Sequence, residues 1–323
     1  MTAREIFLKA LRFERGGRLP CWEWASWWDL TRARWEREGL PAGMVDQTLH
    51  AYFGLDVHYQ TWVSSVVNED CYDDFRAAPE ERYEAWKKKN LFPKDLSQHI
   101  RRIRGYKAEH DAGRCIAWYT MEGWFWFPRK LFGIEGHLFS FHDHPALYHA
   151  ICRDLLEHHK YALDILIKED APEFVLVAED FCYNHGPMLS EEMFNEFMLP
   201  YYRELTAFLH SWNVKVIIDS DGDVTKAVPW LVRTGADGTS PLERQAGVDA
   251  VRLKKDFPNF FFFGGFDKMR MKYGEEVMRQ EFERLLPAIR QGGFIPAVDH
   301  QTPPDVSLEN YKKYVRLLKE YTA

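Results

Sequence analysis

The sequence lacks the features that would place it in a membrane, outside the cell or on nucleic acid. No run of about 18 apolar residues occurs, so no transmembrane helix is expected. The N-terminus has no apolar signal-peptide core, and the five cysteines are scattered without a CxxC pair, which predicts a cytoplasmic protein with free thiols. Basic residues are not in excess, at 42 against 49 acidic ones, so non-specific nucleic-acid binding is not expected.

The composition is otherwise that of a folded globular protein. Hydrophobic residues make up 46% and charged residues 28% of the chain, which argues against disorder. The length of 323 residues allows two domains or one large α/β barrel with additions. The aromatic share of 15%, with 12 Trp, serves a core, a ligand pocket or both, and composition alone does not separate these uses.

The N-terminal third has no regular alternation of strands and helices. Thr2 and Glu5 have the spacing of a capping box, which predicts a helix over residues 2–13. The other predicted segments are a first strand over residues 19–24 that ends at Glu23, a helix over 27–39, a hairpin over 57–67 and a charged stretch outside the core over 80–90.

From residue 114 onward, apolar runs alternate with stretches of helical periodicity. Continuous apolar strands separated by helices indicate a parallel sheet covered on both faces. With the earlier segments the strand count approaches eight, and no GxGxxG follows any strand. The sequence therefore predicts an α/β fold, a single (β/α)8 TIM barrel over residues 1–323 with an N-terminal helical extension. The predicted strands are 115–119, 174–178, 214–218, 238–241, 260–263 and 294–298, and the predicted helices are 145–168, 190–212, 225–234 and 275–291.

Acidic residues follow almost every predicted strand. In such barrels the active site lies at the carboxyl ends of the strands, so these side chains are expected on one rim. Carboxylates crowded there repel one another unless a cation lies among them. We expect them to bind a hard metal ion, to act as general acid and base, or to bind a cationic or hydrogen-bond-donating ligand. The acids are Glu23, Glu122, Glu179, Asp180, Asp219, Asp221, Asp223, Glu243, Asp267 and Asp299.

Some of these acids have structural explanations. Acids after strands often cap the next helix or pair with Arg or Lys, and Asp223 precedes a predicted helix. Asp180 and Asp299 are expected anchors of the same kind. Asp219 and Asp221 are alternate residues of an extended chain and therefore point the same way, which favours a shared function.

Two residues that are not acids are further candidates. His300 ends the last predicted strand beside Asp299, and a neighbouring carboxylate would orient the imidazole for ligand binding or proton transfer. The alternative for His300 is a place in the core. Tyr183 lies in the loop after residues 174–178, where its hydroxyl would donate a hydrogen bond to a substrate oxygen or its ring would pack the loop.

Several different short motifs occur in the second half of the chain. They are Glu179-Asp180, Gly186-Pro187-Met188 with Ser190, Pro200-Tyr201-Tyr202, DSDGDV at 219–224, Gly235-Ala236-Asp237 with Pro241 and Glu243, Gly264-Gly265-Phe266-Asp267, and Gly292-Gly293-Phe294-Ile295-Pro296. On these motifs the chain resembles the uroporphyrinogen decarboxylase superfamily, which contains the decarboxylase and corrinoid-linked methyltransferases. The resemblance covers most of the chain and is strongest over residues 174–317. It implies a (β/α)8 barrel, and it allows a homodimer.

The resemblance places acids where the methyltransferases carry zinc ligands. The His and Cys of their His-x-Cys-Gly motif fall on Asp219 and Asp221, and a later zinc Cys falls near Asp299 and His300. A set of Asp219, Asp221 and His300 is harder than a thiolate site. The resemblance therefore implies a site for Zn, Mn or Mg, or a site without metal.

The N-terminal Arg-rich motif of the decarboxylase is missing. The equivalent residues 22–35 hold five tryptophans, Trp22 and Trp24 among them, with only Arg32 and Arg34 as cations. An acidic, aromatic pocket repels a polycarboxylate. Uroporphyrinogen is therefore not the expected substrate.

The first functional hypothesis is methyl transfer. A small donor with an O- or N-linked methyl group would bind in the aromatic pocket, and the methyl would pass to a corrinoid on a partner protein or to a folate. Asp219, Asp221 and His300 would do metal or acid–base work on the leaving heteroatom. The remaining assignments are Glu179, Glu243 and Asp267 for orienting ligand or metal, and Trp22, Trp24 and Tyr183 for contacting the substrate.

Two alternatives stay open at this point. A decarboxylase of a tetrapyrrole or a smaller acid needs no cofactor, and Asp219 or His300 would protonate the carbon. It predicts a cationic rim from Arg18, Arg129 and Arg244. A non-catalytic ligand-binding module predicts a closed pocket whose acids are all paired with Arg or Lys.

Overall fold

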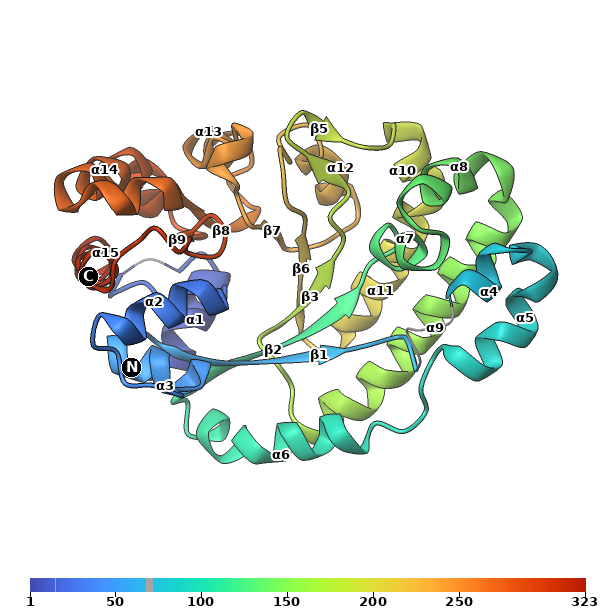
Figure 1. Cartoon of the computed structure of the whole chain (residues 1–323), viewed down its shortest axis with the longest axis horizontal. Helices are drawn as coiled ribbons and strands as arrows, with labels where there is room; N and C mark the ends of the chain where they lie inside the picture. Colours follow the sequence, from blue (N-terminus) through green and yellow to red (C-terminus); the bar gives the residue numbers. More distant parts are fainter. Residues whose placement is uncertain (15, 68–71) are drawn as a thin grey trace.

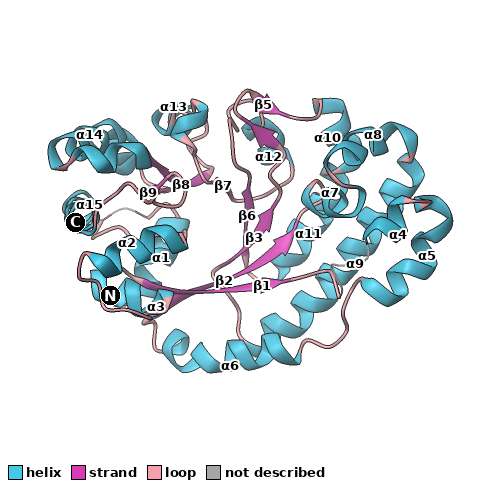
Figure 2. Ribbon diagram, viewed as in Figure 1, coloured by secondary structure: helices cyan, strands magenta, loops and turns pink. Residues whose placement is uncertain are grey.

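The computed structural model of the chain describes residues 1–14, 16–67 and 72–323. Within them, seven strands form one parallel sheet that curls, with helices around its outer face (Figure 1; Figure 2). In spatial order the strands are β1 (Val57–Val63), β2 (Cys115–Glu122), β3 (Phe174–Ala178), β6 (Lys215–Asp219), β7 (Gly238–Ser240), β8 (Phe261–Phe266) and β9 (Phe294–Val298). The prediction of an α/β fold with a parallel sheet is confirmed.

The described helices divide into those that precede β2 in the chain and those that follow it. The N-terminal helices are α1 (Ala3–Leu11), α2 (Asp29–Arg37), α3 (Asp46–Phe53), α4 (Tyr72–Arg76), α5 (Pro79–Asn90) and α6 (Ser97–Asp111). The later helices are α7 (Trp126–Phe132), α8 (Ile134–Asp143), α9 (Pro145–Glu169), α10 (Glu191–Phe197), α11 (Leu199–Ser211), α12 (Val228–Arg233), α13 (Ala250–Asp256), α14 (Glu275–Gln291) and α15 (Leu308–Thr322). A small hairpin, β4 (Cys182–Tyr183) with β5 (Gly186–Pro187), and the 3-10 turns η2 (Arg244–Ala246) and η3 (Lys268–Tyr273) complete the described elements.

Alternate residues of the strands separate into two apolar clusters. On β2, Ile116 and Trp118 belong to a cluster inside the curl, whereas Ala117 and Tyr119 belong to the cluster beneath the helices. The inner cluster continues through Phe174, Leu176, Ile217, Phe261, Phe263 and Ile295. A strand buried on both faces needs apolar residues at both sets of positions, which explains the continuous apolar runs of the sequence.

Helix α1 covers the amino-terminal end of the curl. The Thr2–Glu5 capping box forms as predicted. Phe7 belongs to the inner cluster and stacks on Phe174 of β3, with ring centres 5.8 Å apart. Since α1 occupies this end, the carboxyl end of the strands is the end available for a ligand.

Hydrogen bonds between strands do not close the sheet into an eight-stranded barrel in the described residues. The two edges are β1 and β9, and residues 19–24 lie between them without strand pairing. The Asp56 N–H donates to the Cys21 carbonyl at 2.8 Å, and the Val298 N–H donates to Glu23 Oε1 at 3.3 Å. The predicted first strand was wrong, because single backbone and side-chain contacts, not a ladder, hold this segment in the eighth position.

Two further predictions in the N-terminal third need correction. Residues 57–67 do not form a hairpin, because β1 pairs in parallel with β2, which lies more than 50 residues later in the chain. The β-branched and aromatic content of this segment indicated a strand but not its partner. Residues 80–90 lie in α5, and although most of its side chains are exposed, Tyr83 and Trp86 are buried.

The described cysteines are free thiols, as predicted. Cys21, Cys115, Cys152 and Cys182 are all buried and unpaired, whereas Cys71 lies outside the described residues. Among the helices that the structure describes, none is long and apolar enough to cross a membrane.

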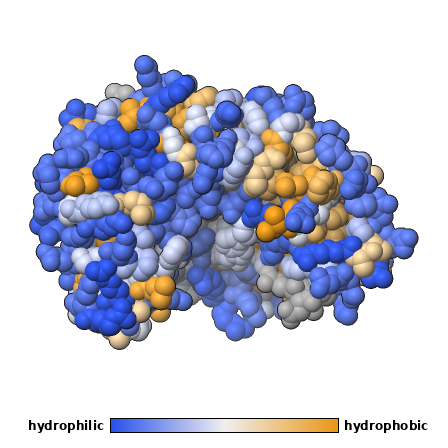
Figure 3. Space-filling view, turned by 45° about the horizontal axis from the view of Figure 1, so that its top comes forward, coloured by the Kyte–Doolittle hydropathy of each residue, from blue (hydrophilic) through white to orange (hydrophobic). Residues whose placement is uncertain are grey.

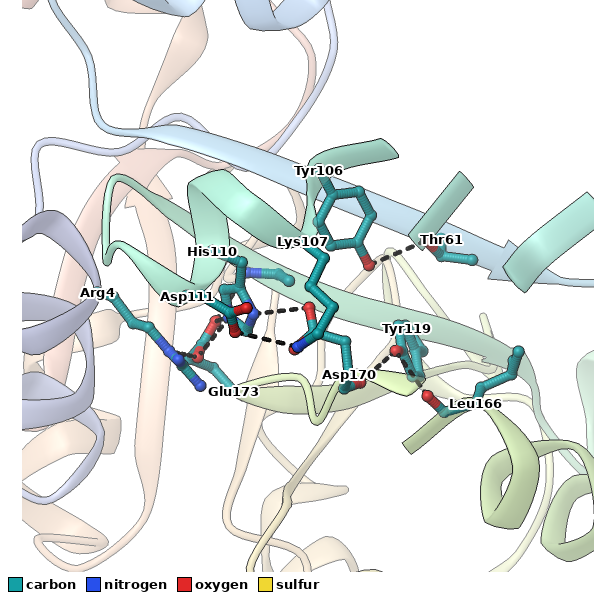
Figure 4. Close-up of polar contacts among 11 residues, drawn as sticks. Arg4, Thr61, Tyr106, Lys107, His110, Asp111, Tyr119, Leu166, Asp170 and Glu173 are labelled. Carbon is teal, nitrogen blue, oxygen red and sulfur yellow. Dashed lines mark hydrogen bonds and ion pairs between the residues drawn. The ribbon is translucent and has the colours of Figure 1, made fainter. Parts of the chain in front are cut away.

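A buried ionic network fixes the amino-terminal end of the sheet. His110 of α6 lies between Asp170 at 2.8 Å and Glu173 at 3.0 Å (Figure 4). Arg4 of α1 donates to Glu173 at 2.6 Å, and the Ala117 N–H of β2 donates to the other oxygen of Glu173 at 2.7 Å. Burial alone would lower the pKa of His110, but its two carboxylate partners outweigh burial and raise the pKa to about 9.

This network predicts a loss of stability at alkaline pH. The pKa of His110 rises from 6.5 in the unfolded chain to about 9 on folding, so its contribution is complete below pH 6.5 and is lost as pH rises through 9. The free energy of unfolding is expected to fall by about 1–3 kcal/mol across this interval. Urea unfolding at a series of pH values measures it, and the fall should be smaller in His110→Gln. Equal slopes in the two proteins would contradict this explanation.

Candidate functional site

A cavity of about 230 Å³ lies at the carboxyl ends of the strands. The face on which these ends open is hollowed near its middle (Figure 3). The floor of the cavity is made by Trp118, Phe174, Leu176 and Phe263, which all belong to the inner cluster. The cavity therefore continues the interior of the curl outward, beyond the last layer of packed aromatic side chains.

The acids of the cavity wall come from the ends of two neighbouring strands. Asp219 ends β6, Asp221 follows it by two residues, and Asp180 follows β3. Ala178 of β3 pairs in register with Asp219, so the two strand ends lie at one level. The structure thus places Asp219 and Asp221 together in the cavity lining, as alternate residues of one extended segment.

Asp219 is the deepest of these acids, and no cation of the described residues lies beside it. Its Oδ1 has no hydrogen-bond partner in the described chain and no contact with bulk solvent. Burial, followed by the charges of Asp221, Asp180 and Glu243, raises the pKa of Asp219 well above its usual value. This environment favours a proton or another positive charge at the carboxyl group.

Asp221, Glu243 and His300 form a second group at the outer edge. His300 Nε2 lies 3.5 Å from Asp221 Oδ2, and the hydrogen bond to Asp221 raises the pKa of His300 against the effect of burial. Glu243 Oε2 accepts the Gly222 N–H at 2.7 Å. One donor atom from each of the three side chains lies within 4.8 Å of the others. One imidazole nitrogen and two carboxylate oxygens suit a divalent cation such as Zn²⁺ or Mn²⁺.

This group differs in one member from the set expected from the sequence. The sequence indicated Asp219, Asp221 and His300, whereas the structure brings Asp221 and His300 together with Glu243. Asp219 lies one inward-facing position deeper on β6 and is directed to the cavity instead. Glu243 reaches the group from the turn after β7, where it precedes η2.

Asp180 and Arg129 hold the outer edge in place. Asp180 adopts a left-handed backbone conformation, with φ of 47°, and its Oδ1 accepts the Asp221 N–H at 3.4 Å. Arg129 of α7 donates to the Asp180 carbonyl at 3.3 Å and lies 3.6 Å from Oδ2. Asp180, expected only as an anchor, therefore both fixes Asp221 and lines the cavity.

Lys268 and Asp299 anchor the other side of the group. Asp299 Oδ2 accepts the Arg244 N–H at 3.0 Å, and Lys268 Nζ lies 3.4 Å from Oδ1. The same ammonium lies 3.8 Å from Glu243. Burial raises the pKa of Asp299 to about 6, although Lys268 opposes this effect. Asp299 has the anchoring role that its position after the last strand suggested.

Glu179 lies outside the cavity lining, in a cradle of backbone donors. Its carboxylate accepts the N–H groups of Trp124, Phe125 and Trp126 at 2.7–3.1 Å and the Tyr202 hydroxyl at 2.5 Å. Burial raises the pKa of Glu179 to about 7 despite these hydrogen bonds. A Cβ at Gly123 would lie 2.1 Å from this carboxylate, which explains the glycine. Glu179 therefore positions the loop that carries Trp126 into the cavity.

Three other candidates from the sequence are not in the lining. Trp22 is fully buried in the inner cluster, where its indole donates to His58 Nδ1 at 2.9 Å. The Tyr183 side chain is 49% exposed in the small hairpin β4–β5. Asp267 caps η3 by accepting the Met269 N–H at 3.0 Å. Their predicted contacts with substrate stay predictions.

Asp223 also differs from its expected place. It caps a turn, by accepting the Thr225 N–H at 3.0 Å, and α12 begins only at Val228. The predicted helix cap at this position was wrong by a few residues, because residues 225–227 form a turn before the helix begins at Val228.

Three tryptophans of the wall come from segments that the sequence predicted as strands or as a hairpin, and Trp126 comes from a segment without a predicted element. Trp24 lines the cavity as predicted from its segment, and its indole donates to the Val298 carbonyl at 2.9 Å. Trp62 of β1, Trp118 of β2 and Trp126 of α7 line it as well. Side chains alternate between the two faces of a strand. This alternation would predict Trp62 and Trp118 on the inner face once β1 and β2 were known to be neighbouring parallel strands. Trp126 has no such signal, since Glu179 positions its loop.

The sequence model of the uroporphyrinogen decarboxylase family matches residues 130–321, which is more than half of the chain. The chain belongs to the uroporphyrinogen decarboxylase family. The matched region includes Asp180, Asp219, Asp221, Glu243 and His300. The tryptophans of the cavity wall all precede residue 130, outside it.

The fold of this family member is also found among solved structures. A methyltransferase from Methanosarcina mazei aligns with a TM-score of 0.66 at 15% identity, covering 100% of both chains. A candidate vitamin-B12-independent methionine synthase from Listeria monocytogenes aligns with a TM-score of 0.49 at 10% identity, covering 95% of this chain and 98% of that one. No curated protein sequence matches the chain. The first likeness shows a shared fold.

The backbone cradle around Glu179 predicts a large cost for replacing one of its acceptor oxygens by an amide NH2 group. In Glu179→Gln an amide NH2 group faces N–H donors, so the free energy of unfolding should fall by about 1–3 kcal/mol. Urea unfolding measures it. The matched control is Glu196→Gln, because the Glu196 side chain is 61% exposed, and its effect should stay within about 0.5 kcal/mol. Similar effects of the two substitutions would contradict the cradle's role.

Proposed function

We propose that this member of the uroporphyrinogen decarboxylase family is an enzyme that transfers a methyl group from a small O- or N-methylated donor to a corrinoid protein or a folate. The observation that carries the proposal is the placement of Asp219 and Asp221 in a cavity walled by tryptophans at the strand ends. The shared fold with a methyltransferase supports it. The donor would occupy the cavity and the acceptor would approach from the open face.

The edge group of Asp221, Glu243 and His300 suits the chemical step. When the methyl carbon is transferred, the acceptor supplies the electron pair of the new bond, and the heteroatom keeps the pair of the broken one. A heteroatom that becomes anionic needs a proton or a Lewis acid. His300, whose pKa is raised by Asp221, can carry that proton. A divalent ion held by the three side chains would supply the Lewis acidity instead.

The lining gives less support to a decarboxylase of a polycarboxylate. That alternative needs a cationic rim, and the described lining holds neither Arg nor Lys. Arg18 donates to Asp56 at 2.7 Å, just before the amino-terminal end of β1. Arg129 pairs with Asp180. Arg244 donates to the Val248 carbonyl at 3.3 Å. The three arginines expected for a carboxylate grip therefore have other partners.

A non-catalytic module is also less supported. That alternative requires acids that are all neutralised by Arg or Lys. Arg129 pairs with Asp180 and Lys268 with Asp299, but neither Asp219 nor Asp221 pairs with a described Arg or Lys. An uncompensated carboxyl in a cavity destabilises a fold, which favours a role in binding or catalysis.

Metal binding tests the edge group. Protein dialysed against Zn²⁺ or Mn²⁺ should retain about one ion per chain by elemental analysis. Glu243→Gln and His300→Ala should each weaken binding about tenfold or more. Asp164→Asn, a change on α9 where the side chain is 44% exposed, should leave binding unchanged. Retention of the ion by both edge variants would contradict the assignment.

Methyl transfer tests the function. The enzyme should form methylcobalamin from cob(I)alamin, or methylated folate, with at least one donor from a panel of methyl ethers and methylated amines. Asp221→Asn should lower the rate about 100-fold or more, because it removes the partner of His300. Asp164→Asn is again the control. No transfer from any donor to either acceptor would contradict the proposal.

A further inference from the structure

One aromatic ring of the cavity wall already packs against a cation that lies outside the lining. The guanidinium of Arg129 lies 4.4 Å from the centre of the Trp126 ring, and Trp126 lines the cavity. Tryptophan is the side chain that binds cations best in this way, and methylated ammonium groups are recognised by cages of such rings. Trp24 and Trp62 belong to the same wall, and Trp62 is 45% exposed.

The charge of the cavity is unbalanced. Three carboxyl groups line it, those of Asp180, Asp219 and Asp221, and the described lining contains no Lys or Arg. Arg129 compensates Asp180 from outside, and His300 faces Asp221 at 3.5 Å. Asp219 has no counter-charge among the residues that the structure describes. The surroundings of Asp219 therefore favour a positive charge in the cavity and oppose a negative one.

Two polar atoms of lining residues lack partners in the described chain. Asp219 Oδ1 is an unmet acceptor, and Trp118 Nε1 is an unmet donor on a side chain that is only 2% exposed. Buried polar groups are normally hydrogen-bonded, so each exception points to a missing partner. A cationic group of a ligand near the Asp219 carboxyl group would compensate its charge, and a ligand oxygen that reached Trp118 Nε1 would accept its N–H.

We propose that the methyl donor is a methylated ammonium compound that carries an oxygen on a short chain. This inference rests on the proposed function and names its substrate class. The indoles of Trp24 and Trp62 would contact the methyl groups, Asp219 would face the charge, and the Trp118 N–H would donate to the oxygen. A neutral methyl ether would lack the attraction to Asp219, and a donor with only a carboxylate would be repelled.

Equilibrium binding separates charge from shape. Choline and 3,3-dimethylbutan-1-ol have the same shape and hydroxyl, but only choline is charged. Calorimetric titration of the full chain should show choline binding about tenfold or more tightly. Asp219→Asn should remove most of this preference while leaving affinity for the alcohol, and Asp164→Asn should change neither. Trp62→Leu, at a half-exposed position, provides a second variant if Asp219→Asn does not fold, with choline affinity reduced about three- to thirtyfold.

The outcomes separate this inference from the proposed function. Equal affinity for the two compounds, or no binding of choline at about 10 mM, overturns the inference. Transfer of a methyl group only from neutral ethers would overturn it while sustaining methyl transfer. Preferential choline binding that depends on Asp219 and Trp62 would sustain the inference, even if no methyl group reached either acceptor.

Discussion

The placement of the uncompensated Asp219 carboxyl group above an aromatic floor is the constraint on which the rest of the site depends. Ile217 and Asp219 of β6 face the inside of the curl, and Asp221 follows two residues beyond the strand. The inward-facing side chains therefore change from apolar to acidic between Ile217 and Asp219. The parallel register with β3 brings Asp180 to the same level. Desolvation and four neighbouring acids raise the pKa of Asp219 and make its bare charge unfavourable, so the cavity favours a proton or another positive charge.

The surrounding elements hold this arrangement from two sides. At the carboxyl end, Glu179 fixes the loop of Trp126 through backbone N–H groups, and Arg129 and Lys268 tie the outer acids. At the amino end, the His110 network joins α1, α6 and β2, far from the cavity. The charged groups of the amino end are matched in pairs, whereas Asp219 is left without a counter-ion. Compensated charges are typical of a structural network, whereas an uncompensated carboxyl group is typical of a ligand-binding site.

Sequence pattern predicted the fold where local signals were sufficient. Residues 174–178 and 275–291 were predicted with the boundaries that β3 and α14 have, because continuous apolar runs and helical periodicity are local properties. Strand pairing is not local, so residues 57–67 have the pattern of a hairpin although β1 pairs with β2. Residues 19–24 have the pattern of a strand although single backbone and side-chain contacts hold them. The sequence predicts which acids belong to the candidate site, but it does not predict how deep each side chain lies. Only the three-dimensional structure shows that Asp219 lines the cavity whereas Glu179 lies in its cradle of backbone N–H groups.

The most direct test of the account is a crystal structure of the protein grown with a methylated ammonium alcohol and a divalent cation. We expect the ammonium group between Trp24 and Trp62 with Asp219 beside it, and the metal on Asp221, Glu243 and His300. A ligand bound elsewhere, together with Asp219 closed off by Arg129 or Lys268, would contradict the central claim that the uncompensated carboxyl group marks the substrate site.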